Sequence, residues 1–292
     1  MSRHTDRAPA LLAPGSTALV TGASSGLGEE FAVQLAGRGL DLVLVARRAE
    51  RLHALADRIA AEYGRRVTVM PFDLSVAGAA SALHAETAAR GLPIDVLINN
   101  AGSGTLADVV VTDPAALDDV IGLNVTALTG LSRLFGGDMA RRGRGALVNV
   151  ASLAALLPAP HMAVYGASKA YVHSFTQAID AELRPAGVIA LTVLPGPTRT
   201  EFFDRSGGRI GPDSAYLTPS VVVASTLRAL DRPKPPIAVV PGRGNAFAAP
   251  LMARLPRRLG LSISGRMMAL GLDIAAKSDT PGTTTPEQEH QQ

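Results

Sequence analysis

The stretch ALVTGASSGLGE, residues Ala18–Glu29, decides the fold of this chain of 292 residues. An apolar run leads directly into Gly22, Gly26 and Gly28, and a segment with helical spacing follows. Glycines at such a turn let backbone N–H groups approach a phosphate, and the N-terminus of the next helix adds partial positive charge. The spacing G-x-x-x-G-x-G therefore predicts a strand–turn–helix unit for a dinucleotide phosphate. Glycine turns of this kind also occur for purely structural reasons, so the rest of the chain must decide.

Short apolar runs alternate with amphipathic stretches along the chain. Most of these runs are apolar throughout, which is typical of strands buried on both faces of a parallel sheet. The repetition predicts a Rossmann-like, doubly wound α/β sheet of about seven parallel strands with helices on both faces. The predicted strands are Ala18–Val20, Leu40–Val45, Val67–Met70, Val96–Ile98, Ala146–Val150, Val188–Val193 and Ala238–Val240, and the predicted helices are Gly26–Arg38, Arg51–Glu62, Ala79–Arg90, Ala115–Arg141 and Val164–Leu183.

The pattern predicts a single domain with a C-terminal extension. We expect a flexible leader at 1–15, the Rossmann domain at 16–245, an apolar and basic helical extension at 246–276 and a disordered tail at 277–292. The extension could cap a substrate pocket, form an oligomer contact or contact a membrane peripherally. The loop Gly196–Thr218 contains Gly and Pro beside aromatic residues, and it is either a substrate loop or a surface excursion.

Composition excludes several classes of protein. Hydrophobic residues make up 47% and charged residues 18%, which supplies a sizeable core and rules out disorder from end to end. The chain has no Cys, which excludes thiolate metal sites and a catalytic thiol, and its histidines have no metal-ligand spacing, so no metal is expected. A net charge of +3 predicts no nucleic-acid partner. No apolar run reaches the length of about 18 residues that a membrane span needs, and a cytoplasmic location is expected.

Ser24 raises an alternative, because Gly22, Ser24 and Gly26 also match the G-x-S-x-G elbow of serine hydrolases. Such an elbow normally follows a central strand, and its triad needs an Asp and then a His later in the chain. Only one predicted strand precedes Ser24, and the only histidine after His173 is His290, in the polar tail. A hydrolase with Ser24 as nucleophile is therefore a remote alternative.

The end of the second predicted strand bears on cofactor choice. Proteins selective for NAD usually place Asp or Glu there, where it binds the ribose hydroxyls. In DLVLVARR that end carries Ala46, Arg47 and Arg48, while Asp41 stands at the start of the strand. A guanidinium can bind a 2′-phosphate through two charge-assisted hydrogen bonds. The pattern favours NADP(H), and a pair of solvated arginines is the alternative.

Tyr165 and Lys169 open a long helical segment, in YGASK. Side chains four residues apart share a helix face, and a neighbouring ammonium favours the phenolate and lowers the pKa of the tyrosine. Such a pair can exchange a proton with a carbonyl oxygen. Ser152 ends the preceding strand, where its hydroxyl could hold a substrate oxygen. His161 lies one helical turn before Tyr165; it either edges the pocket or is a surface histidine.

Together these motifs resemble the classical short-chain dehydrogenase/reductase family over about residues 15–245. TGASSGLG at Thr21–Gly28 is similar to the cofactor loop of that family. Asp73, in FDLS, is similar to the residue that holds the adenine. NNAG at Asn99–Gly102 resembles the motif that stabilises the central sheet and lines the adenine ribose, and PGPTRT at Pro195–Thr200 resembles the segment that cradles the nicotinamide carboxamide.

The resemblance implies four catalytic residues, because Asn124, Ser152, Tyr165 and Lys169 match the family's tetrad in order and approximate spacing. It implies that Tyr165 acts as general acid in reduction and base in oxidation. It implies that Lys169 binds the nicotinamide ribose and lowers the Tyr165 pKa, and that Ser152 orients the carbonyl. Asn124 is implied to bend its helix and to hold a water that links Lys169 to solvent.

The resemblance also implies a cofactor site for NADP(H). Some NADP-selective members carry a basic residue in the glycine loop; Ser25 stands there in this chain, so Arg47, with or without Arg48, would hold the 2′-phosphate. PGPTRTEF and VPGRGN resemble bacterial, NADP-preferring members. The implied cofactor-binding residues are Gly22, Ser24, Ser25, Gly26, Leu27, Gly28, Arg47, Arg48, Asp73, Leu74, Asn100, Ala101, Gly102, Tyr165, Lys169, Pro195, Gly196, Thr198 and Thr200.

The resulting prediction is an NADP(H)-dependent carbonyl reductase or alcohol dehydrogenase. Hydride would pass between the nicotinamide and a ketone or secondary alcohol, and the aromatic residues of the Gly196–Thr218 loop suggest a medium or bulky apolar substrate. The alternative is an NADP-binding sensor or scaffold that does not catalyse. A homodimer or homotetramer is expected, because the family often pairs through the two long helices placed here at Ala115–Arg141 and Val164–Leu183.

Overall fold

A computed structural model describes residues 12–206 and 213–278 of the chain. Its centre is one sheet of seven parallel strands in the order β3-β2-β1-β4-β5-β6-β7. This is the doubly wound, Rossmann-like order, so the predicted fold class is confirmed. The strands are β1 (Thr17–Thr21), β2 (Asp41–Ala46), β3 (Val67–Pro71), β4 (Val96–Asn99), β5 (Gly145–Val150), β6 (Val188–Val193) and β7 (Ala238–Val239).

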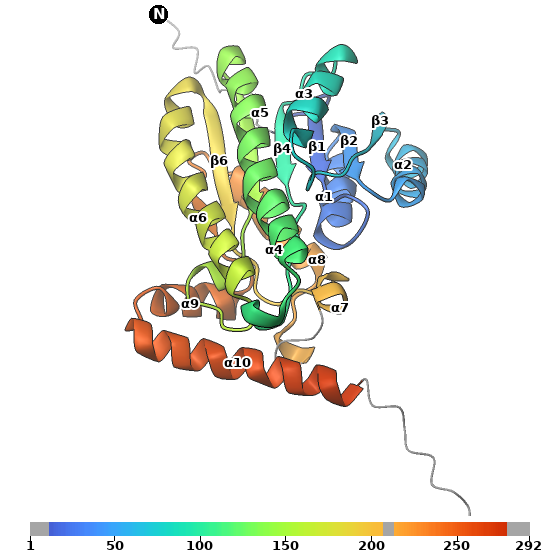
Figure 1. Ribbon diagram of the computed structural model, residues 1–292. Coiled ribbons are helices and arrows are strands. Elements are labelled where there is room, and N and C mark those ends of the chain that lie inside the picture. Colours follow the sequence, from blue (N-terminus) through green and yellow to red (C-terminus); the bar gives the residue numbers. More distant parts are fainter. Residues whose placement is uncertain (1–11, 207–212, 279–292) are drawn as a thin grey trace, which may run out of the picture.

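Helices cover both faces of this sheet (Figure 1). One face packs against α1, α2 and α8, and the other against α3, α5 and α6. The bounds are α1 (Gly26–Gly37), α2 (Ala49–Tyr63), α3 (Ala79–Ala89), α4 (Pro114–Ile121), α5 (Leu128–Arg142), α6 (Ala163–Leu183) and α8 (Pro219–Leu230). Within the described residues, no helix combines the length and apolar character that crossing a membrane requires.

Both faces of the strands are buried, which explains why their sequences are apolar throughout. Along β1, Leu19 belongs to the core on the α3 and α5 side, while Val20 belongs to the core on the α1 side. Both are fully buried. Successive side chains of a strand point to opposite faces, so each strand supplies two cores at once. Because all seven strands are parallel, their carboxyl ends lie along one edge of the sheet.

The predicted helix Ala115–Arg141 is interrupted. It consists of α4, a π-helical segment η2 (Gly122–Ala127) and α5. A π-helical insertion marks a place where a side chain needs a direction that a regular α-helix does not give. Asn124 lies in this segment with no solvent exposure, so the helix is irregular at the residue that the resemblance implied would bend it.

The C-terminal region begins earlier than predicted and contains two helices, α9 (Arg243–Met252) and α10 (Arg257–Ser278). Pro256, just before α10, fixes its own backbone and lacks an N–H, which suits a helix start. In Figure 1, α10 lies across the base of the molecule, and the Ser264 hydroxyl donates a hydrogen bond of 2.6 Å to the Pro158 carbonyl. Residues 1–11 of the predicted leader and 279–292 of the predicted tail lie outside the described residues.

The loop Gly196–Thr218 is not irregular throughout. It contains α7 (Phe202–Ser206) and a short helical turn, Asp213–Ala215. A parallel bridge joins Thr198 to Leu217 and brings the two ends of the loop together. Residues 207–212 lie outside the described residues. A loop closed in this way keeps the aromatic residues of α7 near the carboxyl edge of the sheet.

Candidate active site

The glycine loop is closed too tightly for any side chain. A Cβ atom on Gly28 would stand 2.2 Å from the backbone oxygen of Gly22, and one on Gly26 would stand 2.9 Å from Thr200 Cγ2. Gly22 and Gly26 also have positive φ angles, 67° and 59°, which suit glycine. The Asn100 amide ties the loop to β4 by donating 2.9 Å to the Thr21 carbonyl.

The N-terminus of α1 presents backbone donors at this loop. Ser25 is the N-cap residue, yet its side chain makes no cap hydrogen bond; its hydroxyl instead accepts from Arg48. The first N–H groups of a helix lack partners within the helix, and together with the helix dipole they favour an anion. The bare glycines and these donors fit the diphosphate of a dinucleotide.

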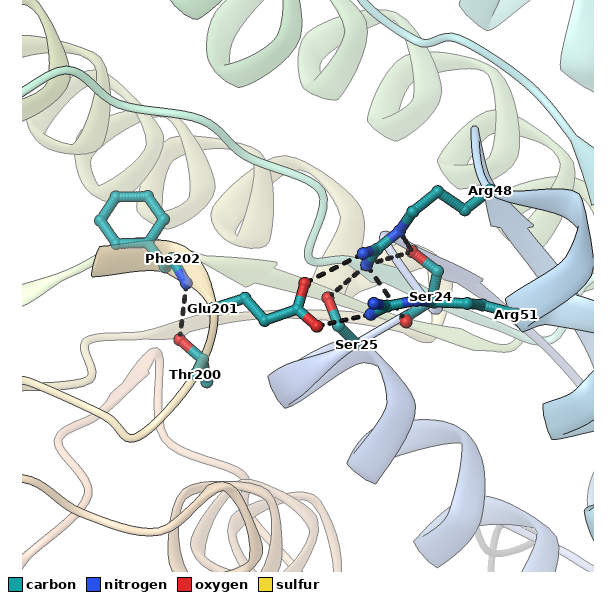
Figure 2. Close-up of polar contacts among 7 residues, drawn as sticks. All are labelled: Ser24, Ser25, Arg48, Arg51, Thr200, Glu201 and Phe202. Atoms are coloured by element: carbon teal, nitrogen blue, oxygen red, sulfur yellow. Dashed lines mark hydrogen bonds and ion pairs between the residues drawn. The ribbon is translucent and has the colours of Figure 1, made fainter. Parts of the chain in front are cut away.

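Arg48 folds back over the glycine loop (Figure 2). Its Nη2 donates to the hydroxyls of Ser24 and Ser25 at 3.0 and 2.9 Å, and its Nη1 donates to Glu201 at 3.0 Å. Arg51, one turn into α2, binds the same carboxylate. The Ser24 hydroxyl thus accepts from a guanidinium, whereas a hydrolase elbow would need it to face an imidazole.

Arg47 takes a different direction. It is mostly exposed, and its Nη1 lies 3.8 Å from an Asp73 carboxylate oxygen. The backbone N–H and the hydroxyl of Ser75 donate to Asp73, which holds the pKa of that carboxyl below its ordinary value, and Arg47 adds a smaller effect. From the sequence, Arg47 was the preferred candidate for binding a 2′-phosphate. In the structure it is Arg48 that contacts the serines of the glycine loop.

Lys169 and Asn124 meet behind the loop that follows β4. Lys169 is 5% exposed, and its Nζ donates 2.8 Å to the Val150 carbonyl at the end of β5. The Asn124 amide donates to the Ser103 carbonyl and the Ser168 hydroxyl, and its oxygen accepts from the Ser103 N–H. A Cβ on Gly102 would stand 3.2 Å from both Asn124 Oδ1 and Lys169 Nζ, so both groups lie close to this glycine and leave little room for a side chain there.

Tyr165 points toward Ser152 across the end of β5. Burial raises the pKa of Tyr165 to about 12, and its hydrogen bond with the Ser152 hydroxyl acts in the lowering direction. Burial lowers the pKa of Lys169 to about 8. The direction for Tyr165 is therefore opposite to the sequence prediction. The physical reason is that burial removes water from the phenol and so disfavours its charged form. The Lys169 Nζ lies 5.7 Å from the centre of the Tyr165 ring and donates its hydrogen bond to a backbone carbonyl.

An apolar cluster surrounds the exposed side of Tyr165. The Phe202 ring lies 5.2 Å from the Tyr165 ring, and aromatic contacts continue through Phe203 to Tyr216 at 5.4 Å each. The cluster is completed from the loop after β4, the start of α6 and α10, by Leu106, Ala159, Met162 and Met268. Side chains from four segments thus form an apolar surface beside the phenol.

The remaining predicted residues lie along the same edge. Leu153 N–H donates 2.9 Å to the Pro195 carbonyl, which places PGPTRT beside Ser152. His161 pairs with Asp108 at 2.6 Å and has a positive φ of 62°, so it holds a surface turn. Arg51 and Glu201 also belong to the cluster around Arg48, and neither was predicted from the sequence. The spacing of Arg48 and Arg51, one helical turn apart, was the available signal for Arg51.

The chain is similar in sequence and in fold to several known dehydrogenases and reductases. The very-long-chain 3-oxoacyl-CoA reductase of Meyerozyma guilliermondii is 35% identical over 183 residues, 60% of this chain and 54% of that protein. The chain spans about half the length of the first curated relatives it matches. A solved short-chain dehydrogenase from Sphingobium yanoikuyae in complex with NADPH has 31% identity and a TM-score of 0.73, covering 94% of this chain and all of that one. A bulky-bulky ketone specific alcohol dehydrogenase from Comamonas testosteroni has 29% identity and a TM-score of 0.69, covering 93% and 97%.

The fold and the glycine loop are those of a Rossmann-type, dinucleotide-binding protein. A family model described as short chain dehydrogenase matches residues 16–208. The chain belongs to the short-chain dehydrogenase family, and the resemblance drawn from its motifs is confirmed.

Proposed function

We propose that this protein is an NADP(H)-dependent oxidoreductase that interconverts a ketone and a secondary alcohol. One observation carries the proposal: the four side chains of the implied tetrad gather at the carboxyl edge of the sheet, beside a glycine loop that only a backbone can line. The bound cofactor supplies or accepts the hydride. The chain's own residues hold the substrate oxygen and move its proton.

Tyr165 is the proton donor in the direction of reduction. With a pKa near 12, its phenol keeps its proton at neutral pH and can give it to a carbonyl oxygen as that oxygen gains charge. Ser152, already bonded to the phenol, steadies the same oxygen and stabilises the phenolate that remains. Lys169 adds a buried positive charge beside the ring, which favours that phenolate further. Asn124 fixes the loop that flanks the Lys169 amine.

The preference for NADP(H) over NAD(H) rests on the arginines after β2. Arg48 stands on the glycine loop, and Arg47 stands at the strand end, where an NAD-selective protein would carry a carboxylate. The similarity to a protein solved with NADPH supports this choice.

The substrate we propose is a bulky apolar carbonyl compound. The aromatic and aliphatic cluster beside Tyr165 offers a surface for such a group. A relative that reduces very-long-chain 3-oxoacyl-CoA and a neighbour specific for bulky-bulky ketones are consistent with it.

A Tyr165→Phe variant tests the catalytic role. We expect turnover with NADPH and a bulky ketone to fall by a factor of about 100 or more, as loss of a general acid does, while NADPH affinity followed by nicotinamide fluorescence changes little. Tyr171→Phe, on the same helix but on its outer side, is the matched control and should keep full activity. A sensor or scaffold would show no turnover in either protein.

We also propose that copies of the chain pair through α5 and α6. Tyr171 is 38% exposed on α6, stacks on Phe175 at 5.5 Å and hydrogen-bonds Thr129 of α5, so this exposed aromatic pair is tied to the neighbouring helix. Light scattering of the wild type and Tyr171→Glu would test this pairing. A cytoplasmic location stays a prediction that cell fractionation can check.

A further inference from the structure

Glu201 reaches from the segment before α7 to the two arginines that follow β2. Its Oε2 accepts from Arg48 Nη1 at 3.0 Å, and its Oε1 accepts from Arg51 Nη1 at 2.5 Å (Figure 2). One carboxylate thus bridges two guanidinium groups about 150 residues away along the chain.

The bridged arginines lie where the adenosine end of a dinucleotide is held. Arg48 closes the carboxyl end of β2 and also donates to Ser24 and Ser25 of the glycine loop. In Rossmann-like sites the group at this strand end contacts the adenosine ribose, and its sign of charge selects between a free hydroxyl and a 2′-phosphate. Carboxylate and phosphate are alternative ligands for the same guanidinium donors. Two anions at one pair of guanidinium groups also repel each other.

We propose that Glu201 competes with the 2′-phosphate of NADP(H) for Arg48 and Arg51, and thereby sets how strongly the protein prefers NADP(H) over NAD(H). The inference rests on the proposed function, in which this site binds NADP(H). It makes Arg51 a second phosphate ligand and Glu201 a specificity-determining residue. NAD(H) has no phosphate at this position, so its binding leaves the bridge in place.

The bridge is weak enough to be displaced. The side chains of Arg48, Glu201 and Arg51 are 32%, 38% and 52% exposed. Ion pairs this exposed contribute only a few-fold to an equilibrium constant. A 2′-phosphate carries more charge than a carboxylate and can engage both guanidinium groups. The carboxylate therefore moderates NADP(H) affinity without abolishing it.

Titration of purified variants with NADPH and NADH, followed by nicotinamide fluorescence, tests the proposal. Glu201→Gln should lower the Kd for NADPH about five-fold and leave the Kd for NADH unchanged. Arg51→Gln should raise the Kd for NADPH about five-fold, with NADH again unchanged. The matched control is Glu50→Gln, which removes the same charge from an exposed position on the first turn of α2.

Three results would overturn the proposal. An unchanged NADPH affinity in Glu201→Gln would show that there is no competition. Weaker binding of both cofactors in that variant would show that the bridge closes over the bound cofactor instead. An equal gain in NADPH affinity in Glu50→Gln would show that the effect comes from removing any nearby negative charge and not from competition for the arginines. If the wild type bound neither cofactor, the proposed function itself would fail, and this inference would fall with it.

Discussion

A Lys169→Met variant separates the effect of Lys169 on the stability of the folded protein from its effect on catalysis. Burial lowers the Lys169 pKa from 10.5 to about 8. Each pKa unit corresponds to 1.36 kcal/mol, so keeping the ammonium buried costs roughly 3 kcal/mol at neutral pH. Met has a similar shape and no charge, but it loses the hydrogen bond to the Val150 carbonyl, which contributes about 1.5–3 kcal/mol when the donor is charged. We therefore expect Lys169→Met to be more stable at pH 7 by about 1 kcal/mol, while catalysis is lost.

The pH dependence of this difference gives the sharper test. Between pH 8 and 10.5 the unfolded chain holds the Lys169 proton that the folded protein has released, so wild-type stability rises with pH across this window. The cost of burial falls to roughly 1 kcal/mol at pH 10 by the same relation. The advantage of the variant should therefore vanish or reverse between pH 7 and pH 10.

Denaturant unfolding at both pH values, followed by far-ultraviolet circular dichroism, measures the effect. Lys234→Met is the matched control, because Lys234 is exposed and its replacement should change stability little at either pH. A Lys169→Met variant that is less stable than wild type at pH 7 would refute the reasoning. An advantage that stays constant from pH 7 to pH 10 would refute it equally, because burial of charge would then not be its cause.

Three further predictions follow from the site and the C-terminal helices. Because the Tyr165 pKa lies near 12, alcohol oxidation should accelerate as the pH rises from 7 to 10, whereas ketone reduction should not; initial rates in both directions check this, and equal profiles would contradict it. Gly28→Ala places a Cβ 2.2 Å from a backbone oxygen of the loop and should weaken NADPH binding at least ten-fold, whereas Gly137→Ala on α5, which meets only the end of an arginine side chain at 3.8 Å, should not. If the C-terminal extension contacts a membrane, replacing exposed Phe247 and Leu251 of α9 by Ser should abolish co-sedimentation with anionic vesicles; no sedimentation of the wild type would exclude that role.

Most of the fold could be predicted from patterns among residues that are close together in the sequence. The glycine loop could be read because turn glycines and the first helical residues sit side by side in the chain, and the apolar strands could be read because both their faces are buried. The tetrad could be read as a set because strand ends of a parallel sheet meet at one edge. Pro256, just before α10, was a local signal for the break between the two C-terminal helices. The boundary was not predicted, because the apolar and basic pattern continues on both sides of Pro256.

What the sequence could not supply depends on distant contacts. Arg48 and Glu201 are 153 residues apart, and nothing near either residue indicates the other. The choice between Arg47 and Arg48 also depends on the serines of a different turn. The direction of the Tyr165 pKa was mistaken because spacing on a helix shows that Lys169 is near, but packing decides how much solvent the phenol loses.

The buried polar groups at the carboxyl edge fall into two kinds, and the difference separates structure from chemistry. Asn149 is fully buried, but its oxygen accepts from Asn99 at 2.9 Å and its amide donates to Thr176 at 2.9 Å, so it holds strands and helix together at little cost. Lys169, whose Nζ donates 2.8 Å to the Val150 carbonyl at the same strand end, is also buried, and this burial disfavours its charge and lowers its pKa to about 8. A charge kept where it destabilises the fold, beside a phenol whose deprotonated form it favours, is expected of a group retained for catalysis. A lysine of purely structural value would leave its amine in water.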